Sequence, residues 1–158
     1  GIIGLGAIGQ RTAKLAQAFG CKVIAWNRSP KKIEGITIVD KETLFKESDI
    51  ISIHIALNEE TRDFITAKEI ELMKSSAIIV NAARGPIINT SDLAQALKNG
   101  RIAGAALDVY DTEPPLKGDN PILTAPNTLL LPHIGFATKE AFELRLGIVV
   151  KNVEKFAK

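Results

Sequence analysis

The chain has 158 residues, of which 46% are hydrophobic and 24% charged, and a formal net charge of +2. This balance is typical of one globular domain with its own core and excludes a disordered chain. The small, evenly spread charge argues against nucleic acid or a membrane surface as a partner, and no apolar run approaches the length of a bilayer span. The single cysteine, Cys21, excludes an internal disulfide framework and fits a cytoplasmic location.

Short β-branched runs alternate with helical patterns along the chain, which predicts βαβ units. We therefore expect an α/β fold of the Rossmann type, a doubly wound parallel sheet with helices on both faces. The predicted strands cover residues 2–5, 22–26, 37–39, 50–55, 77–81, 102–107 and 128–131. Helices are predicted over 8–19, 66–73, 91–98 and 138–156, and residues 111–127 form one long loop that contains four prolines.

The first motif is Gly4-Leu-Gly-Ala-Ile-Gly9, directly after a predicted strand and at the start of a helix. Gly4 permits a tight turn, Gly6 lets the backbone approach a pyrophosphate, and Gly9 lets helix and strand pack closely. Phosphates bind free N–H groups at such a helix start, here at Ala7 and Ile8. The motif predicts dinucleotide binding, and the alternative is a glycine turn of purely structural use.

The end of the second strand reads Asn27-Arg28-Ser29, where an NAD-specific site normally has Asp or Glu. Arg28 can donate charge-assisted hydrogen bonds to a 2′-phosphate, and Ser29 can donate one more. The sequence thus favours NADP(H). The alternative is that NAD(H) binds through Asn27 and that Arg28 is a solvated loop residue.

Three chemically active side chains follow later strands: Arg84, Glu113 and His133. Ligands of parallel sheets bind at the carboxyl ends of the strands, so these residues are candidates for a catalytic site. Each alone also has an ordinary explanation, as a surface cation, a loop carboxylate and a histidine satisfied by its neighbours. No pattern of metal ligands is present, and we expect no metal.

Four ordered blocks together resemble the D-isomer-specific 2-hydroxyacid dehydrogenase family over essentially the whole chain. They are residues 4–9, 81–86, 106–115 and 132–138. The resemblance implies that Arg84 binds the carboxylate and keto oxygen of a 2-keto or D-2-hydroxy acid and that His133 is the acid/base. It also implies that Glu113 is the partner of His133 and that Asp108 lies by the nicotinamide. The relatives are commonly homodimers.

The chemistry of the reaction agrees with these implied roles. The cofactor supplies a hydride, so the protein must supply a proton and hold the substrate. Arginine binds carboxylates through two parallel hydrogen bonds, and histidine is the usual acid/base at neutral pH. A carboxylate beside the histidine orients the ring and stabilises the imidazolium.

The chain departs from the family pattern in three regions. Ala56 and Asn58 replace a frequent Pro and Thr near the adenosine ribose, and Phe136 stands where serine is common, in the wall near His133. Ala82 and Pro86 replace a frequent threonine and glycine without touching a charged role.

Competing functions share this fold. One is an NAD-sensing co-repressor, which would not need Arg84, Glu113 and His133; another is a formate dehydrogenase, in which glutamine replaces the acid beside the histidine. The phosphoglycerate and phosphite branches stay open, as does the identity of the acid. The first predicted strand lies at the very start of the sequence, directly after Gly1. We therefore expect residues 1–158 to be the dinucleotide-binding domain of a longer protein whose substrate domain is absent.

Overall fold

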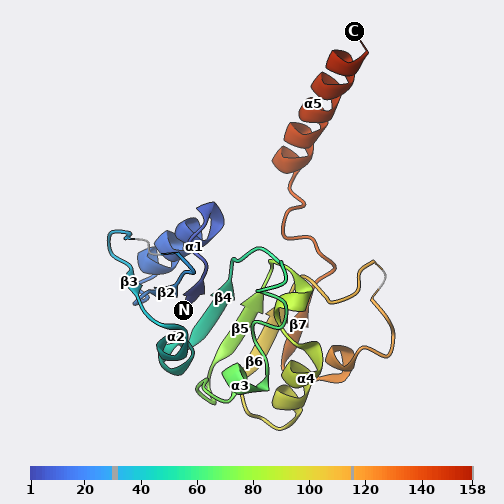
Figure 1. Cartoon of the computed structure of the whole chain (residues 1–158). Helices are drawn as coiled ribbons and strands as arrows, with labels where there is room; N and C mark the ends of the chain where they lie inside the picture. Colours follow the sequence, from blue (N-terminus) through green and yellow to red (C-terminus); the bar gives the residue numbers. More distant parts are fainter. Residues whose placement is uncertain (30–31, 115, 158) are drawn as a thin grey trace.

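Seven strands form a single parallel sheet in the order β3-β2-β1-β4-β5-β6-β7 in the computed structural model, which describes residues 1–29, 32–114 and 116–157 (Figure 1). Their bounds are β1 (Ile2–Ile3), β2 (Ile24–Trp26), β3 (Thr37–Ile38), β4 (Ile50–Ile53), β5 (Ile78–Asn81), β6 (Gly104–Leu107) and β7 (Thr128–Leu130). All seven predicted strands are present, and the doubly wound parallel sheet is confirmed. The order reverses between β1 and β4, which is where such sheets bind ligands.

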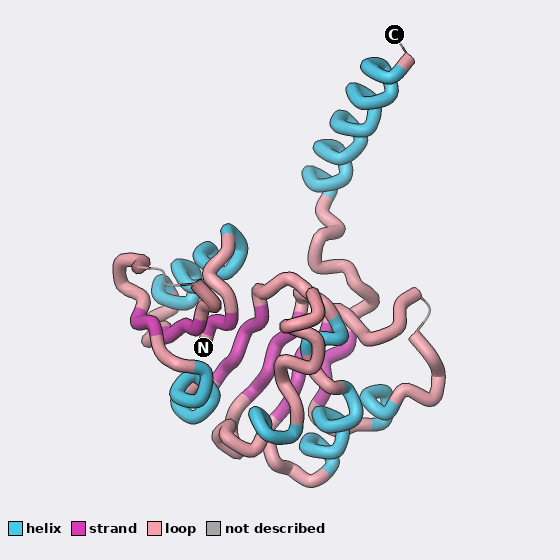
Figure 2. The backbone as a smooth tube through the Cα atoms, viewed as in Figure 1, coloured by secondary structure: helices cyan, strands magenta, loops and turns pink. Residues whose placement is uncertain are grey.

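Helices cover both faces of the sheet, as predicted. Successive strand residues point to opposite faces, so Ile2 and Ile3 belong to two separate cores. Ile2 packs in the core that contains Ala13 of α1, whereas Ile3 packs in the core that contains Leu44 of α2 and Leu93 of α4. The helices are α1 (Ala7–Ala18), α2 (Lys41–Glu47), α3 (Ala67–Ile70) and α4 (Thr90–Lys98), shown in cyan in Figure 2.

Helix α2 was not among the predicted elements. Its start was nevertheless readable, because Asp40 caps the helix by accepting a hydrogen bond from the backbone N–H of Thr43. The buried pair Leu44 and Phe45 then attaches it to the sheet. Two apolar residues in seven are too few to show a helical period.

Helix α1 differs from the expectation in the face that it buries. Its apolar residues Ile8, Leu15 and Phe19 are 71%, 63% and 87% exposed. The sheet is instead contacted by the small residues Gly9 and Ala13, which let the helix approach closely. The spacing of the apolar residues therefore predicted the helix correctly, but it did not predict which face of the helix is buried.

The remaining differences are in length. Helix α3 ends at Ile70 rather than at the predicted residue 73, and the loop 111–127 contains a 3-10 turn, η2 (Pro121–Thr124). Another 3-10 turn, η1 (Gly85–Ile87), follows β5. Pro115, which ends one of the four sequence blocks, lies outside the described residues.

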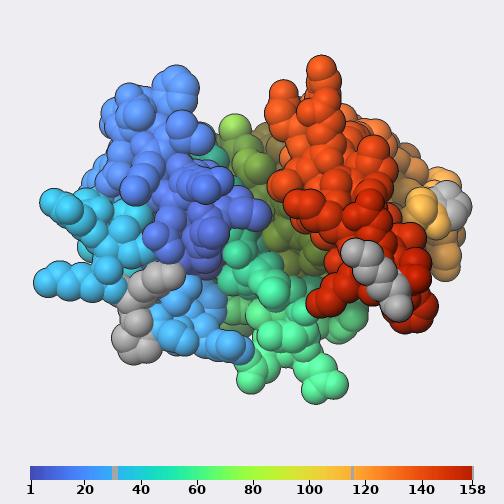
Figure 3. Space-filling model, turned by 90° about the horizontal axis from the view of Figure 1, so that it is seen from above, coloured from blue at the N-terminus to red at the C-terminus, as the bar shows by residue number. Residues whose placement is uncertain are grey.

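The predicted final helix is present as α5 (Lys139–Phe156), capped by the Thr138 hydroxyl. It projects away from the sheet (Figures 1 and 2), and its side chains are almost all exposed, including Phe142, Leu146 and Val153. Seen from above, a hollow separates α1 from the C-terminal segment, and residues from the middle of the chain lie at its floor (Figure 3).

Candidate active site

The candidate site residues all follow the carboxyl ends of strands. Because the sheet is parallel, these ends share one edge, with the turns after β1, β2 and β4 at one part of it and those after β5, β6 and β7 at the other. The sequence-predicted residues therefore form two groups, one around the glycine turn and one around His133.

The glycine turn has the geometry that its three glycines require. Gly4 has a φ of +94°, which other residues rarely adopt. A Cβ on Gly9 would lie 2.0 Å from the carbonyl oxygen of Gly4, so only glycine lets α1 start this close to β1. A Cβ on Gly6 would meet nothing within 4 Å, which leaves this backbone open to a ligand.

A cavity of about 240 Å³ lies beside this turn. It is lined by Gly4, Gly6, Trp26, Asn27, Arg28, Ser29, His54, Ile55, Ala56, Asn58 and Thr61. Ala7 and Ile8 form the first turn of α1 next to it, where backbone N–H groups lack partners within the helix. An open glycine backbone, a helix N-terminus and a neighbouring cavity are what a dinucleotide phosphate requires.

The Asn27 side chain links the turn after β1 to the turn after β2. Its Oδ1 accepts a hydrogen bond from the Leu5 N–H at 2.9 Å, and its Nδ2 donates to the Ser29 carbonyl at 2.8 Å. Asn27 therefore has a structural task in addition to its predicted contact with a ribose.

Arg28 is paired within the chain. Its guanidinium donates to the Glu60 carboxylate at 2.7 Å, and both side chains are about 70% exposed, at 69% and 70%. Sequence reasoning did not identify Glu60, because nothing in the sequence joins it to a residue 32 positions earlier.

His54 lies two residues before Ala56, the first departure from the family pattern in this segment. It lines the cavity, and its Nε2 lies 2.9 Å from the Ser52 hydroxyl. Burial lowers the pKa of His54 below its ordinary value, which favours the neutral ring. Asn58, which stands where threonine is frequent, forms a closed turn with Thr61. The Asn58 Oδ1 accepts a hydrogen bond from the Thr61 N–H at 3.0 Å, and the Thr61 hydroxyl accepts one from the Asn58 N–H at 2.8 Å.

At the other group, the turn after β5 carries Arg84. The buried Asn81 shapes this turn, because its side chain donates to the Arg84 carbonyl and accepts from the Ala83 N–H. A Cβ on Gly85 would lie 1.9 Å from the carbonyl carbon of Tyr110, so the glycine lets the backbone after β6 approach the Arg84 turn. The Arg84 guanidinium donates to the Ala83 carbonyl at 2.6 Å.

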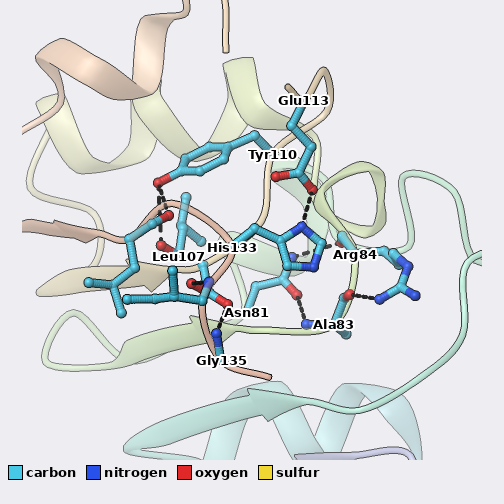
Figure 4. A network of polar contacts seen from close by, with 11 residues as sticks. Asn81, Ala83, Arg84, Leu107, Tyr110, Glu113, His133 and Gly135 are labelled. Carbon is cyan, nitrogen blue, oxygen red and sulfur yellow. Dashed lines mark hydrogen bonds and ion pairs between the residues drawn. The ribbon is translucent and has the colours of Figure 1, made fainter. Parts of the chain in front are cut away.

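Glu113 and His133 are in direct contact. His133 Nδ1 lies 3.0 Å from Glu113 Oε1, and the side chains are 40% and 22% exposed (Figure 4). The structure thus joins two residues that are 20 positions apart in the sequence. Arg84 belongs to the adjacent strand end without a direct bond to either of them among the described contacts.

The loop that carries His133 is fixed by the segment after β6. The Tyr110 hydroxyl donates to the Leu131 carbonyl at 2.8 Å, and the Asp108 carboxylate accepts the backbone N–H groups of Ile134 and Gly135. Burial, and then the negative charges of Asp108 and Glu113, raise the pKa of Tyr110, so its phenol remains a donor.

Phe136 forms an aromatic wall next to the histidine. The ring centroids of Phe136 and His133 are 5.8 Å apart and the rings meet edge to face at 83°. Both residues line a largely apolar cavity of about 570 Å³, together with Tyr110, Glu113, Pro114, Leu116, Leu130, Leu131 and Pro132. The departure from serine at this position therefore makes the surroundings of His133 more apolar.

The described residues contain neither a metal-binding cluster nor a membrane-spanning helix. No group of three or more His, Cys, Asp or Glu side chains there could hold a metal ion. Likewise, none of the helices in the described ranges combines the length and the apolar character needed to cross a membrane.

The sheet order, the glycine turn at the strand-order reversal and the cavity beside it define a dinucleotide-binding domain of the Rossmann type. Residues 1–135 match the family model described as D-isomer specific 2-hydroxyacid dehydrogenase, NAD binding domain. The chain belongs to this family.

Similar proteins agree with this assignment. The chain is 47% identical to a glyoxylate reductase of Thermococcus litoralis, over all of this chain and 48% of that protein. Among solved structures, it is similar to an acyclic imino acid reductase, Bsp5, in complex with NADPH and D-Arg, with 39% identity, a TM-score of 0.87 and coverage of 99% and 50%. An NAD-complexed D-isomer specific 2-hydroxyacid dehydrogenase of Lactobacillus delbrueckii ssp. bulgaricus has 32% identity, a TM-score of 0.88 and coverage of 99% and 52%. The chain spans about half the length of these relatives.

Proposed function

We propose that residues 1–158 are the dinucleotide-binding domain of an oxidoreductase that transfers a hydride between NAD(P)H and a 2-keto acid, or its D-2-hydroxy acid. The observation that most supports this proposal is the 3.0 Å contact between His133 Nδ1 and Glu113 at the edge of the sheet that also carries Arg84. The substrate domain is proposed to come from other residues of a longer chain, since the relatives are about twice as long. Glyoxylate, hydroxypyruvate and pyruvate are the first substrates to test.

The proposed roles follow from the chemistry of these side chains. The nicotinamide supplies the hydride when the cofactor is bound. Arg84 holds the substrate carboxylate through its planar guanidinium. His133 faces Glu113 with Nδ1, so Nε2 is the atom that gives a proton to the keto oxygen, and the Glu113 charge stabilises the imidazolium before transfer. In the oxidative direction neutral His133 accepts the same proton.

NADP(H) is the proposed preferred cofactor. Arg28 and Ser29 line the cavity beside the glycine turn, and the residues that line it include no carboxylate that would repel a 2′-phosphate. An opposing charge is provided by Glu60, which pairs with Arg28 at 2.7 Å. Relatives of known structure include one with NADPH and one with NAD, so both cofactors need testing.

We also propose that the full-length protein, on which the oligomeric state is to be tested, is a cytoplasmic homodimer. Cys21 is a free, exposed thiol, which is stable in a reducing compartment. The large apolar side chains exposed on α1 and α5 offer surface that a second copy can cover. Sedimentation velocity tests this, and a single monomeric species at all concentrations would refute the dimer.

The experiment that tests the function is a reductase panel with the three acids and both cofactors, on a longer enzyme that contains this domain. His133→Ala should lower the reductive kcat/KM about 10²–10⁴-fold and leave nucleotide binding nearly unchanged. The 158-residue chain alone should bind nucleotide without turnover. Unchanged kcat/KM in His133→Ala, or nucleotide binding with no reductase activity in the longer protein, would refute the proposal.

A further inference from the structure

Asp108, directly after β6, is a buried carboxylate whose two oxygens are both used by one short piece of backbone. Only 6% of the Asp108 surface is exposed. One oxygen accepts the N–H of Ile134 at 2.8 Å, and the other accepts the N–H of Gly135 at 2.7 Å. These lengths are typical of charge-assisted hydrogen bonds, and a buried carboxylate needs such donors. The two donors are the residues that immediately follow His133.

His133 itself has an unfavourable backbone conformation. Its φ is +55°, in the left-handed region that residues with a Cβ rarely occupy. Such a conformation persists only where the surroundings hold it. The bonds to Ile134 and Gly135 fix the peptide groups on the C-terminal side of His133, and thus the direction in which its side chain leaves the backbone.

The N-terminal side of the same loop is fixed separately. The Leu131 N–H donates to the Leu107 carbonyl at 2.9 Å, and the Tyr110 hydroxyl donates to the Leu131 carbonyl at 2.8 Å. Both bonds hold Leu131, which precedes Pro132, and neither involves a residue after Pro132. The Asp108 carboxylate therefore restrains the side of the loop that follows His133.

We propose that Asp108 is a positioning residue, whose carboxylate holds the His133 loop so that Nδ1 meets Glu113 and the opposite ring nitrogen faces the reaction site. The proposal rests on the proposed role of His133. This role is separate from the position by the nicotinamide that the family resemblance implies, and the two are compatible because each carboxylate oxygen can accept more than one hydrogen bond.

Nuclear magnetic resonance of the 158-residue chain tests this without relying on activity. The chain has only two histidines, His54 and His133, so the ring signals of both can be assigned. Asp108→Asn keeps one acceptor oxygen but places an NH₂ group against the second backbone donor. Gly135→Ala perturbs the same contact from the other side, because its Cβ would lie 2.9 Å from the Asp108 carboxylate.

Each variant has a matched control from the same region. Asp111→Asn removes the same charge from a carboxylate that accepts from Asn120 rather than from the His133 loop. Gly118→Ala adds a methyl group where a Cβ would meet nothing within 4 Å. Gly135 is exposed and has no positive φ, so its alanine variant keeps the test valid if Asp108→Asn fails to fold.

In both test variants we expect the proton contacts between the His133 ring and Glu113 to disappear and the Ile134 and Gly135 amides to exchange roughly tenfold faster or more. The His54 ring signals and both control variants should stay as in the parent. A His133 ring that keeps its Glu113 contact in both test variants would overturn the proposal. The proposed function fails by a different result, an active His133→Ala enzyme.

Discussion

The Arg28 guanidinium donates a 2.7 Å hydrogen bond to the Glu60 carboxylate at the edge of the cavity that we assign to the nucleotide. A 2′-phosphate at this edge can pair with Arg28 through hydrogen bonds between two opposite charges, whereas the 2′-hydroxyl of NAD(H) offers only a neutral acceptor. Arg28→Ala should therefore weaken NADPH binding by about 1–3 kcal/mol and leave NADH nearly unaffected. Fluorescence titration of the 158-residue chain with each nucleotide measures this, and equal losses for both would contradict the assignment.

Glu60 is expected to oppose the same phosphate. Glu60→Gln removes the charge that competes for Arg28, and an exposed charge at close range is worth about 1 kcal/mol. NADPH affinity should rise about 2- to 5-fold, while NADH affinity stays constant. The neighbouring Glu59→Gln is the matched control, because it removes the same charge from outside the Arg28 ion pair. A gain of equal size in both variants would indicate a general charge effect.

Gly9 and Gly6 should respond differently to alanine. Gly9→Ala forces a methyl group to within 2.0 Å of the Gly4 carbonyl, so α1 must move away from β1. The free energy of unfolding should fall by about 1–3 kcal/mol. Gly6→Ala has open space and a φ of −68°, so its stability loss should stay below about 1 kcal/mol.

The affinity for nucleotides provides a second test of the role of Gly6. Gly6→Ala should lower the affinity for both nucleotides at least roughly tenfold, because its methyl group occupies the path by which a pyrophosphate reaches the backbone. Urea unfolding and nucleotide titration of the same samples give both numbers. A Gly6→Ala protein with the affinity of the parent would show that the phosphates do not approach this turn.

The sequence was sufficient to predict the sheet and the position of the candidate site residues at its edge. β-branched runs marked all seven strands, and strand ends placed Arg84, Glu113 and His133 at one edge. The contact between Glu113 and His133 was implied by the family resemblance but not by the residues alone, because it depends on close backbone approaches such as that of Gly85 to Tyr110. The bonds from Asp108 to residues 134 and 135 are of the same kind.

The spacing of hydrophobic residues predicted the presence of a helix better than it predicted which residues of the helix are buried. In α1 the large residues Leu15 and Phe19 are exposed, and the small residues Gly9 and Ala13 form the contact with the sheet. A spacing pattern shows that an apolar face exists but not what covers it. The ion pair between Arg28 and Glu60 could not be predicted from the sequence either, because exposed ion pairs produce no periodic pattern of residues.

The pH dependence of stability should report on His54. Burial lowers its pKa below the ordinary value of 6.5, so the unfolded chain binds the proton more readily than the folded chain does. The contribution of His54 to stability is therefore complete above pH 6.5 and is lost as the pH falls below it, with a slope of at most about 1.4 kcal/mol per pH unit.

The Gly1 amino group, whose pKa is lowered to about 6 by burial, adds a slope of the same sign in an overlapping range, so the parent alone cannot isolate the histidine. The decisive quantity is the difference in the free energy of unfolding between the parent and His54→Gln, measured by urea denaturation from pH 5.5 to 7.5. Glutamine does not titrate and retains hydrogen-bonding groups towards Ser52, so this difference should shrink as the pH falls below 6.5. A difference between parent and His54→Gln that stays constant over this range would mean that the folded chain does not favour the neutral ring.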